Sequence, residues 1–312
     1  MVARRPPLTL AFEPRFCANH VVDLTAGCTF GCLYCPFADV RARATGVPAP
    51  LAVDMQPLPG LPAPATVMLS PASDPFAPQA AARTHALLAH LLPRGTVVGL
   101  LTKGTIPRRT LDLLAAYAPQ VEGVGIGLTS LDDARNRRLE PGCPPARARL
   151  ETLARVVRRG LPCALRLDPI FPDLDDADDA LAALVDAAAA RGATGVTATY
   201  LFAFGRARRR LRHEPLAAAS LACLIERAPM EGGVAFSVPL ARKLATYARL
   251  AALCAARGMR FSTCGCKDLR VRDAGDFVTR CRNTEYLAAA TRNAGCPAPA
   301  RVTPVAPTAV PR

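Results

Sequence analysis

The segment Cys28-Thr-Phe-Gly-Cys32-Leu-Tyr-Cys35 carries three cysteines in the spacing C-x3-C-x2-C, directly after a short apolar run at residues 21–25. A loop this short can bring three thiolates to one metal centre. An iron–sulfur cluster is normally held by four cysteine thiolates. Three thiolates would leave one iron of a four-iron cluster open to a small molecule. The spacing therefore predicts a cluster site with Cys28, Cys32 and Cys35 as the metal ligands.

A zinc loop, or a set of structural thiols, is the alternative for this segment. Structural zinc sites usually show paired C-x2-4-C elements with four ligands close together, or they include a pair of histidines. No further Cys or His follows within about twenty residues of Cys35. The sequence therefore favours the cluster.

The composition bounds the architecture. The chain has 312 residues, of which 51% are hydrophobic and 21% charged. This length suits one large domain, or one domain with a small appendage, around a sizeable core. The formal net charge of +14 points to an anionic partner, because a basic surface attracts polyanions. A solvated basic surface is the alternative.

Twelve cysteines would suit disulfides in a secreted protein. The N-terminal residues are basic but contain no apolar run long enough for a signal peptide. No stretch near 18 residues is purely apolar, so we expect no membrane span. We expect a cytoplasmic protein, in which cysteines stay reduced and bind metals.

Apolar runs alternate with helix-like segments along the first two thirds of the chain. The expected strands cover residues 20–25, 66–70, 96–102, 123–129, 163–168 and 195–201, and the expected helices cover residues 81–92, 107–117, 146–159 and 175–190. Repeated strand–helix units imply a parallel sheet with right-handed crossovers. The predicted class is α/β, and the six units suggest a partial (β/α)6 barrel. Active groups then belong at the carboxyl ends of the strands.

Several motifs follow these strands in order. They are Ser70-Pro-Ala-Ser73-Asp74-Pro75-Phe76, Thr102-Lys103-Gly104, Leu139-Glu140-Pro141, Arg149-Leu150 and Leu165-Arg166-Leu-Asp168-Pro169-Ile-Phe-Pro172. Together with the cysteine loop, and with Tyr34 before its third cysteine, they resemble the spore photoproduct lyase-like branch of the radical S-adenosylmethionine (radical SAM) enzymes. The resemblance extends from about residue 10 to residue 205. It implies the partial radical SAM barrel over residues 1–205.

The resemblance also implies cofactors and a reaction. In that family the open iron of a [4Fe–4S] cluster chelates the amino and carboxylate groups of SAM. The reduced cluster then cleaves the sulfonium to a 5′-deoxyadenosyl radical. The expected partner is a flavodoxin- or ferredoxin-type electron donor.

Residues at the strand ends are the candidates for binding SAM. Its carboxylate needs a cation or several donors, which Lys103 or Arg166 would supply. Acceptors for its ammonium are expected from Ser70, Ser73 and Asp74, and an adenine wall from Tyr34 or Phe37. Thr129 and Ser130 are candidates for the ribose or the carboxylate. Capping and turn roles are the alternative for each polar residue.

The remaining residues form a Cys-rich C-terminal extension. We expect helices at 215–227 and 239–257, a short strand at 259–262, and a disordered tail at 297–312. Within the 206–296 region, four thiols are candidates for an auxiliary [4Fe–4S] cluster or a tetrahedral zinc, namely Cys264, Cys266, Cys281 and Cys296. Free thiols are the alternative. Cys143, in a loop expected near the barrel mouth, is a candidate hydrogen-atom donor.

Three functions are consistent with the sequence. The leading one is a radical SAM enzyme that abstracts hydrogen from a peptide or small natural product. A lyase that repairs DNA or RNA lesions is the second, because the basic run at residues 206–213 suits phosphate contacts. However, the family's lyase has a cysteine where residues 70–73 are Ser-Pro-Ala-Ser, and it lacks the four-cysteine tail. A non-enzymatic metal-thiolate protein that binds nucleic acid is the third.

Overall fold

The structure, a computed structural model, describes residues 10–12, 20–37, 51–52, 66–70, 72–203, 205–230, 233–274 and 277. Its main sheet has eight strands in the order β1-β2-β5-β6-β7-β8-β9-β12. Their bounds are β1 Leu10–Phe12, β2 His20–Val22, β5 Thr66–Leu69, β6 Val97–Thr102, β7 Val121–Gly127, β8 Cys163–Ile170, β9 Gly195–Tyr200 and β12 Arg260–Thr263. Seven strands are parallel, and β1 pairs antiparallel with β2 at the edge. The sheet is open among the described strands, as a partial barrel requires.

Buried aliphatic side chains explain why these short runs form a parallel sheet. Val67 and Leu69 of β5 and Val98 and Leu100 of β6 are at most 1% exposed. The register pairs Leu69 with Leu100 across the two strands. Parallel strands covered on both faces read as nearly continuous apolar runs, so the predicted strands are confirmed with boundary shifts of a few residues.

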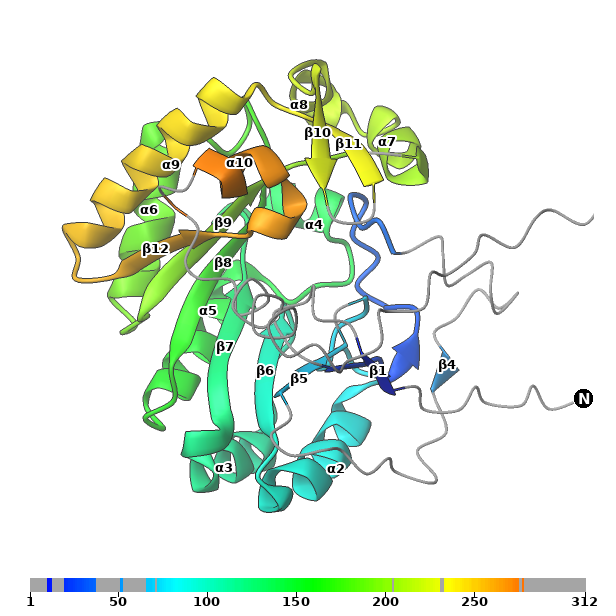
Figure 1. Cartoon of the computed structure of the whole chain (residues 1–312), viewed down its shortest axis with the longest axis vertical. Helices are drawn as coiled ribbons and strands as arrows, with labels where there is room; N and C mark the ends of the chain where they lie inside the picture. Colours follow the sequence, from blue (N-terminus) through cyan, green and yellow to red (C-terminus); the bar gives the residue numbers. More distant parts are fainter. Residues whose placement is uncertain are drawn as a thin grey trace, which may run out of the picture.

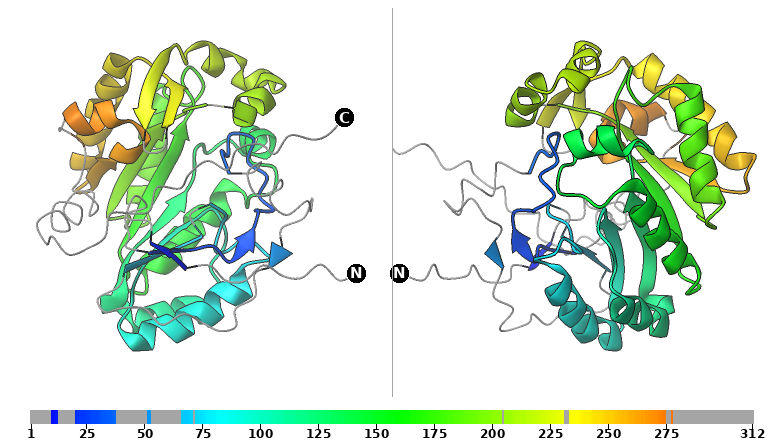
Figure 2. Two further views of the ribbon diagram at one scale, coloured as in Figure 1. Left: turned by 45° about the vertical axis from the view of Figure 1, so that its right-hand side comes forward. Right: turned by 180° about the vertical axis from the view of Figure 1, so that it is seen from behind.

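Helices connect the strands, and several of them cover one side of the sheet (Figure 1). Their bounds are α2 Ala81–Leu91, α3 Arg108–Ala116, α4 Asp133–Leu139, α5 Ala146–Val157, α6 Asp178–Ala189, α7 Gly205–Arg212, α8 Ala218–Ala222, α9 Leu240–Ala255 and α10 Leu269–Ala274. Short 3-10 turns are η2 Leu92–Arg94, η3 Ala118–Gln120, η4 Pro215–Ala217 and η5 Gly265–Lys267. Figures 1 and 2 show α5, α6 and α9 along one side of the sheet, opposite the segment that follows β2. No helix in the described part of the chain is long and apolar enough to cross a membrane.

One predicted helix is wrong at its carboxyl half. Residues 215–222 are helical, but β10 (Glu226–Met230) then pairs with β11 (Gly233–Ser237) as an antiparallel hairpin. Leu224 and Ala228 are buried while Ile225 and Arg227 are exposed. Because Leu224 and Ala228 are four residues apart, this burial also fits one face of a helix, and the pairing of β10 with β11 defines the strand.

The region after residue 205 contributes to the same sheet. The predicted strand near 259–262 is β12, which pairs in parallel with β9. The hairpin is also joined to the chain after β9, where the backbones of Ala203 and Phe236 exchange two hydrogen bonds of 3.0 and 3.2 Å. A small antiparallel pair, β3 (Thr25–Ala26) with β4 (Leu51–Ala52), flanks the start of the cysteine loop.

Candidate active site

The cysteine loop, residues 27–37, begins just past the carboxyl end of β2. Gly27 and Gly31 have φ values of +104° and +60°, a region that glycine adopts without a Cβ penalty. The Cys35 N–H donates to the Cys32 carbonyl at 3.1 Å, which tightens the loop between two of its thiols. The three cysteines are half-buried and form no disulfide. The chain thus presents three thiols outside any disulfide in one short loop, at the edge expected for the active site.

Residues 139–143, called here the supporting segment, lie alongside this loop. The Leu33 N–H donates to the Leu139 carbonyl at 3.0 Å, and the Gly142 N–H donates to the Phe30 carbonyl at 3.0 Å. A Cβ on Gly142 would lie 2.3 Å from the Thr29 carbonyl oxygen. The close approach of the two backbones therefore requires glycine at position 142.

A buried polar cluster fastens the two segments. Tyr34 donates its hydroxyl to Glu140, and the other Glu140 oxygen accepts a 2.5 Å bond from Arg149. Glu140 and Arg149 are each 1% exposed. Burial alone would raise the pKa of Glu140, but the charges of Lys103 and Arg149 outweigh it and hold that pKa below its usual value. Tyr34, expected as an adenine wall, therefore points into this cluster, where its ring also meets Phe171 edge-on at 5.6 Å.

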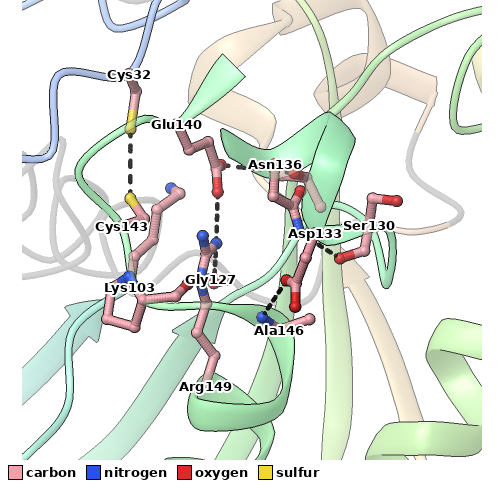
Figure 3. Close-up of polar contacts among 12 residues, drawn as sticks. Cys32, Lys103, Gly127, Ser130, Asp133, Asn136, Glu140, Cys143, Ala146 and Arg149 are labelled. Carbon is pink, nitrogen blue, oxygen red and sulfur yellow. Dashed lines mark hydrogen bonds and ion pairs between the residues drawn. The ribbon is translucent and has the colours of Figure 1, made fainter. Parts of the chain in front are cut away.

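A fourth thiol lies beside the cysteine loop. Figure 3 shows Cys143 of the supporting segment pointing toward Cys32, with 3.8 Å between the two Sγ atoms. The contact lowers the pKa of Cys32 and raises that of Cys143, as expected when the Cys143 thiol donates to Cys32. Sequence spacing did not reveal this pair, because 111 residues separate its members.

Cys28, at the start of the loop, is half-buried near Asp74. Burial, followed by the nearby Asp74 charge, raises the pKa of Cys28 to about 12. Cys32 and Cys35 lie close enough to contribute to the same shift. Metal coordination reverses this preference, because a coordinated thiol is deprotonated outright.

Arg210 of α7 also binds the backbone of the cysteine loop. Its Nε donates to the Leu33 carbonyl at 3.0 Å and its Nη2 to the Cys35 carbonyl at 2.6 Å. Figure 1 shows α7 next to the loop segment that follows β2. The basic run therefore includes an arginine that binds the loop backbone, which its sequence pattern did not indicate.

The polar residues after β5 bind the start of the same loop. Ser70, with a φ of +50°, donates its N–H to the Val22 carbonyl at 2.6 Å and accepts from Leu24 N–H at 3.3 Å. Ser73 donates its hydroxyl to Asp23 at 3.4 Å, and Asp23 also accepts from Ala72 N–H. These bonds fix the exit of β2 relative to β5.

Asp74 links β5 to the end of β6. Its Oδ1 accepts from Thr102 Oγ1 at 2.6 Å and from Phe76 N–H at 2.9 Å, and its Oδ2 accepts from Lys103 N–H at 2.8 Å. Burial dominates its environment and raises its pKa. A carboxylate has about four acceptor positions, and the described residues supply three donors to Asp74.

Lys103 lies across the inner side of β7, at the centre of the site. A Cβ on Gly127 would come within 2.8 Å of Lys103 Cγ, so glycine there leaves room for the lysine stem. Its Nζ lies 5.6 Å from the centre of the Tyr34 ring. Burial opposes its charge, yet Glu140, Cys32, Cys143 and Asp168 together raise its pKa above the ordinary value. Lys103 is therefore a cation next to the thiols.

Thr129 and Ser130 follow β7 and have different partners. Thr129 Oγ1 accepts a 2.6 Å bond from Arg135 and donates to Glu140 at 3.5 Å. Ser130 accepts from Asp132 N–H at 3.1 Å, at the turn into α4. The structure thus joins Thr129 to the buried cluster and places Ser130 in a turn.

Arg166 of β8 pairs with Asp168 two residues later. Their closest atoms are 2.7 Å apart, and Asp168 is also bound by Lys267 from the C-terminal region. Burial would raise the pKa of Asp168, but Lys267 and Arg166 hold it well below its usual value. The Arg166 guanidinium therefore sits in a charge-compensated pair.

The other sequence-predicted residues are only partly within the described structure. Phe37 is half-buried at the end of the cysteine loop, and Cys264, half-buried, follows β12. The Cys266 side chain, Cys281, Cys296 and residues 297–312 lie outside the described residues.

The residues present fit a four-iron cluster in kind and number. Three thiols share one backbone turn, held by Leu139, Glu140 and Arg210. No three His, Cys, Asp or Glu side chains in the described ranges converge on the position of a single metal ion. A four-iron cluster is normally held by four thiolates, so three thiolates would bind three of its irons and leave the fourth open to SAM.

The family model for the radical SAM superfamily matches residues 22–185. The chain belongs to the radical SAM superfamily. This enzyme superfamily uses a [4Fe–4S] cluster with SAM, and the matched residues include the cysteine loop, the supporting segment and the ends of β5 to β8. Membership therefore implies the predicted radical SAM fold, one [4Fe–4S] cluster and SAM.

Solved structures of spore photoproduct lyase share the fold. One variant, with bound AdoMet and dinucleoside spore photoproduct, has a TM-score of 0.62 and 14% identity, covering 82% of this chain and 78% of that chain. The lyase complexed with dinucleoside spore photoproduct also has a TM-score of 0.62, at 15% identity, covering 82% and 79%. These likenesses establish the architecture of the radical SAM core.

Curated relatives match a shorter part of this chain. Uncharacterised protein ORF301 of Acidianus two-tailed virus is 33% identical over 106 residues, which is 34% of this chain and 35% of the relative. An uncharacterised protein of Mycobacterium tuberculosis is 36% identical over 114 residues, or 35% of this chain and 33% of the relative. The matches thus span about a third of each protein.

Proposed function

We propose that the chain is a [4Fe–4S]-dependent enzyme that cleaves SAM reductively and abstracts hydrogen from a peptide or a small natural product. The observation that carries this proposal is the three-thiol turn held between the supporting segment and Arg210, with Lys103 beside it. When bound, the reduced cluster supplies the electron that splits SAM to a 5′-deoxyadenosyl radical.

The residues of this chain have distinct tasks in the proposal. Cys28, Cys32 and Cys35 hold the cluster, and Lys103 attracts the SAM carboxylate as the cation next to the thiols. Arg166 is the second cation for that carboxylate, although its pairing with Asp168 reduces its available charge.

Acceptors for the SAM ammonium come from the turn after β5. Asp74 keeps one acceptor position beyond its three described donors, and Ser70 and Ser73 flank it. Phe37 is the aromatic side chain left for the adenine, because Tyr34 is held by Glu140. Thr129 and Ser130, just after β7, are the candidates for contact with the ribose or the carboxylate of SAM.

The test is SAM cleavage by anaerobically reconstituted, dithionite-reduced protein. Wild type should form 5′-deoxyadenosine, and Cys28→Ala, Cys32→Ala and Cys35→Ala should each abolish it. Cys223→Ala, a half-buried cysteine next to Asp173 on another part of the surface, is the matched control. Retained 5′-deoxyadenosine formation in the loop variants would contradict the proposal.

A nucleic-acid substrate is the second candidate, and a surface near the cysteine loop favours it. On α7, Arg206, Arg209 and Arg212 are exposed, while Arg210 of the same helix binds the loop. The neighbouring hairpin exposes Val234 and Phe236, and Arg208 stacks over the Phe236 ring at 4.5 Å. Arginines contact phosphates, and exposed aromatic rings stack on unpaired bases.

Salt dependence separates the two substrate classes. If nucleic acid binds here, the logarithm of affinity should fall linearly with the logarithm of salt, with a slope of about −0.9 for each phosphate contacted in duplex DNA. Replacing Arg206, Arg209 and Arg212 by alanine should reduce that slope by about 3. Absence of binding to duplex and single strands at low salt would leave the peptide or small-molecule class.

A further metal site at the C-terminal cysteines belongs to the same proposal. We infer that Cys264, Cys266, Cys281 and Cys296 bind an auxiliary [4Fe–4S] cluster or a zinc ion. The support is the C-x-C pair with two more cysteines in one short window, and the position of Cys264 directly after β12 of the main sheet.

A flavodoxin- or ferredoxin-type protein is proposed as the source of the electrons that reduce the cluster.

A further inference from the structure

The Cys143 thiol is the feature of the site that the proposed reaction leaves unused. It is not part of the C-x3-C-x2-C spacing, yet its Sγ lies 3.8 Å from the Sγ of Cys32. Figure 3 shows the two side chains directed at each other from different segments of the chain. A thiol is a weak S–H donor, and sulfur is a weak acceptor. The distance suits an S–H···S hydrogen bond.

The backbone fixes this contact from both segments. The Cys143 N–H donates to the Glu140 carbonyl at 3.0 Å, and the adjacent Gly142 N–H donates to the Phe30 carbonyl of the cysteine loop at 3.0 Å. On the following side, the Pro144 carbonyl accepts a 2.7 Å bond from the buried Arg149. The backbone of Cys143 is therefore held on both flanks, which keeps its Cα close to the cysteine loop.

The local charges make such a contact useful for electron uptake. Reduction adds negative charge to an iron–sulfur cluster, and hydrogen bonds to its sulfurs are one of the factors that set its reduction potential. A donor aimed at a ligand sulfur stabilises the reduced form more than the oxidised form. At Cys32 the Glu140 carboxylate opposes added negative charge and the Lys103 cation favours it, so a thiol donor at Cys32 acts in the same direction as Lys103.

We propose that Cys143 donates its thiol hydrogen to the sulfur of Cys32 and thereby raises the reduction potential of the bound cluster. The inference rests on the proposed function, since it requires a cluster at Cys28, Cys32 and Cys35. Cys143 is a positioning residue: it acts on the cluster through Cys32, and it needs neither to bind iron nor to contact the substrate.

The test is an EPR-monitored redox titration of the reconstituted protein, with iron content measured on each sample. Cys143→Ala and Cys143→Val remove the donor and should lower the ratio of reduced to oxidised cluster about threefold at a fixed applied potential. That change corresponds to about 28 mV for a one-electron couple. Cys143→Ser keeps a hydroxyl donor and should restore the wild-type ratio. Cys223→Ala is the matched control and should leave it unchanged.

Each outcome bears on the inference. Full iron content with an unchanged ratio in Cys143→Ala and Cys143→Val would overturn it, and so would a Cys143→Ser ratio equal to that of Cys143→Ala. Loss of iron from both Ala and Val variants, with Ser retaining it, would overturn it in favour of a purely structural contact. A wild-type protein that binds no iron would overturn the proposed function as well. A wild type that binds iron and cleaves SAM while the ratios stay equal would overturn this inference alone.

Discussion

Tyr34 of the cysteine loop donates its hydroxyl to Glu140 of the supporting segment. This hydrogen bond joins the loop to a carboxylate that is 1% exposed and that also binds Arg149 at 2.5 Å. Tyr34, the residue before the third cysteine, thus links two segments through a partner 106 residues away in the sequence. The loop geometry depends on a buried ion pair that lies outside the loop.

Removal of Glu140 from its ion pair with Arg149 should destabilise the fold. We expect Glu140→Ala to lower the free energy of unfolding by about 3–5 kcal/mol, because it leaves the Arg149 charge buried without its partner. Tyr34→Phe should cost about 1.5–3 kcal/mol, the value of a hydrogen bond to a charged group. Urea unfolding of the metal-free, reduced protein gives both numbers.

Glu151→Ala is the matched control, because Glu151 forms an exposed ion pair with Arg158 and should affect unfolding little. Equal unfolding midpoints for Glu140→Ala and Glu151→Ala would show that the buried pair does not stabilise the fold.

Arg210 should control how firmly the loop retains its metal. Its two bonds to the Leu33 and Cys35 carbonyls restrain the backbone that carries two of the three thiols. We expect Arg210→Ala to release iron to a chelator several-fold faster than wild type, with an unchanged initial iron content. Arg209→Ala, an exposed neighbour on the same helix, should behave like wild type. Identical release rates for the two variants would contradict the restraint.

Gly127 should be required for the position of Lys103. An alanine there would place its Cβ 2.8 Å from Lys103 Cγ, so the stem of the lysine must shift from its present position. If Lys103 binds the SAM carboxylate, Gly127→Ala should raise the Kd for SAM about tenfold, a loss of about 1.4 kcal/mol. Isothermal titration calorimetry with cluster-loaded protein measures this Kd.

Gly123 on the same strand provides the control. A Cβ at Gly123 would meet its nearest neighbour, the Pro162 carbonyl oxygen, at 3.9 Å, an ordinary contact. Gly123→Ala should therefore keep the wild-type Kd. A Kd for Gly127→Ala that matches Gly123→Ala would argue against Lys103 as the carboxylate partner.

The parallel sheet could be predicted because its signal is local. Runs such as Val67 to Leu69 are apolar on both faces, and turn signals such as Gly160, with a φ of +73°, end the preceding helices. The hairpin after residue 225 was missed because its strands are short and lie beside helical sequence. The buried pair Leu224 and Ala228, four residues apart, fits a helix face as well, and only the pairing of β10 with β11 defines the strand.

The site was predictable only where spacing along the chain carries the chemistry. The three cysteines are neighbours in sequence, so a pattern finds them. The Cys32–Cys143 contact, the Arg210 bonds to the loop and the Tyr34–Glu140 bond connect residues more than 100 positions apart. The fold alone determines which of many Cys, Arg and Glu residues meet there.

Asp175 should make the folded state less stable as the pH rises from 4 to 7, the reverse of what most carboxylates do. Burial raises its pKa from 3.8 to about 6, despite its contact with Arg135. Since the folded state then holds a proton more tightly than the unfolded state, this group stabilises the fold at pH 4 and loses that contribution as the pH rises through about 6. The loss amounts to about 3 kcal/mol.

Comparison with Asp175→Asn isolates this effect. The stability of the variant relative to wild type should improve between pH 4 and pH 7, because asparagine has no proton to lose. Asp179→Asn, an exposed position in α6 four residues after Asp175, should show no such change. A difference between Asp175→Asn and wild type that is constant across this range would indicate that Asp175 ionises with its ordinary pKa.

The number of irons should tell whether the C-terminal cysteines hold a second cluster. A three-thiol loop accounts for four irons, and a cluster at Cys264, Cys266, Cys281 and Cys296 would bring the total to about eight. We expect a variant with these four cysteines changed to alanine to fall to about four irons and four sulfides while it keeps the SAM-responsive EPR signal. The substitutions remove only the four C-terminal thiols, so the cluster in the cysteine loop serves as an internal control.

The alternative results separate zinc from empty thiols. About four irons in both proteins, together with one zinc lost in the variant, would identify a tetrahedral zinc site. Four irons and no zinc in either would show that the tail thiols hold no metal. Either result removes a second cluster as an electron relay or substrate ligand. The single cluster beside Lys103 and Cys143 would then have to take its electron directly from the reducing partner.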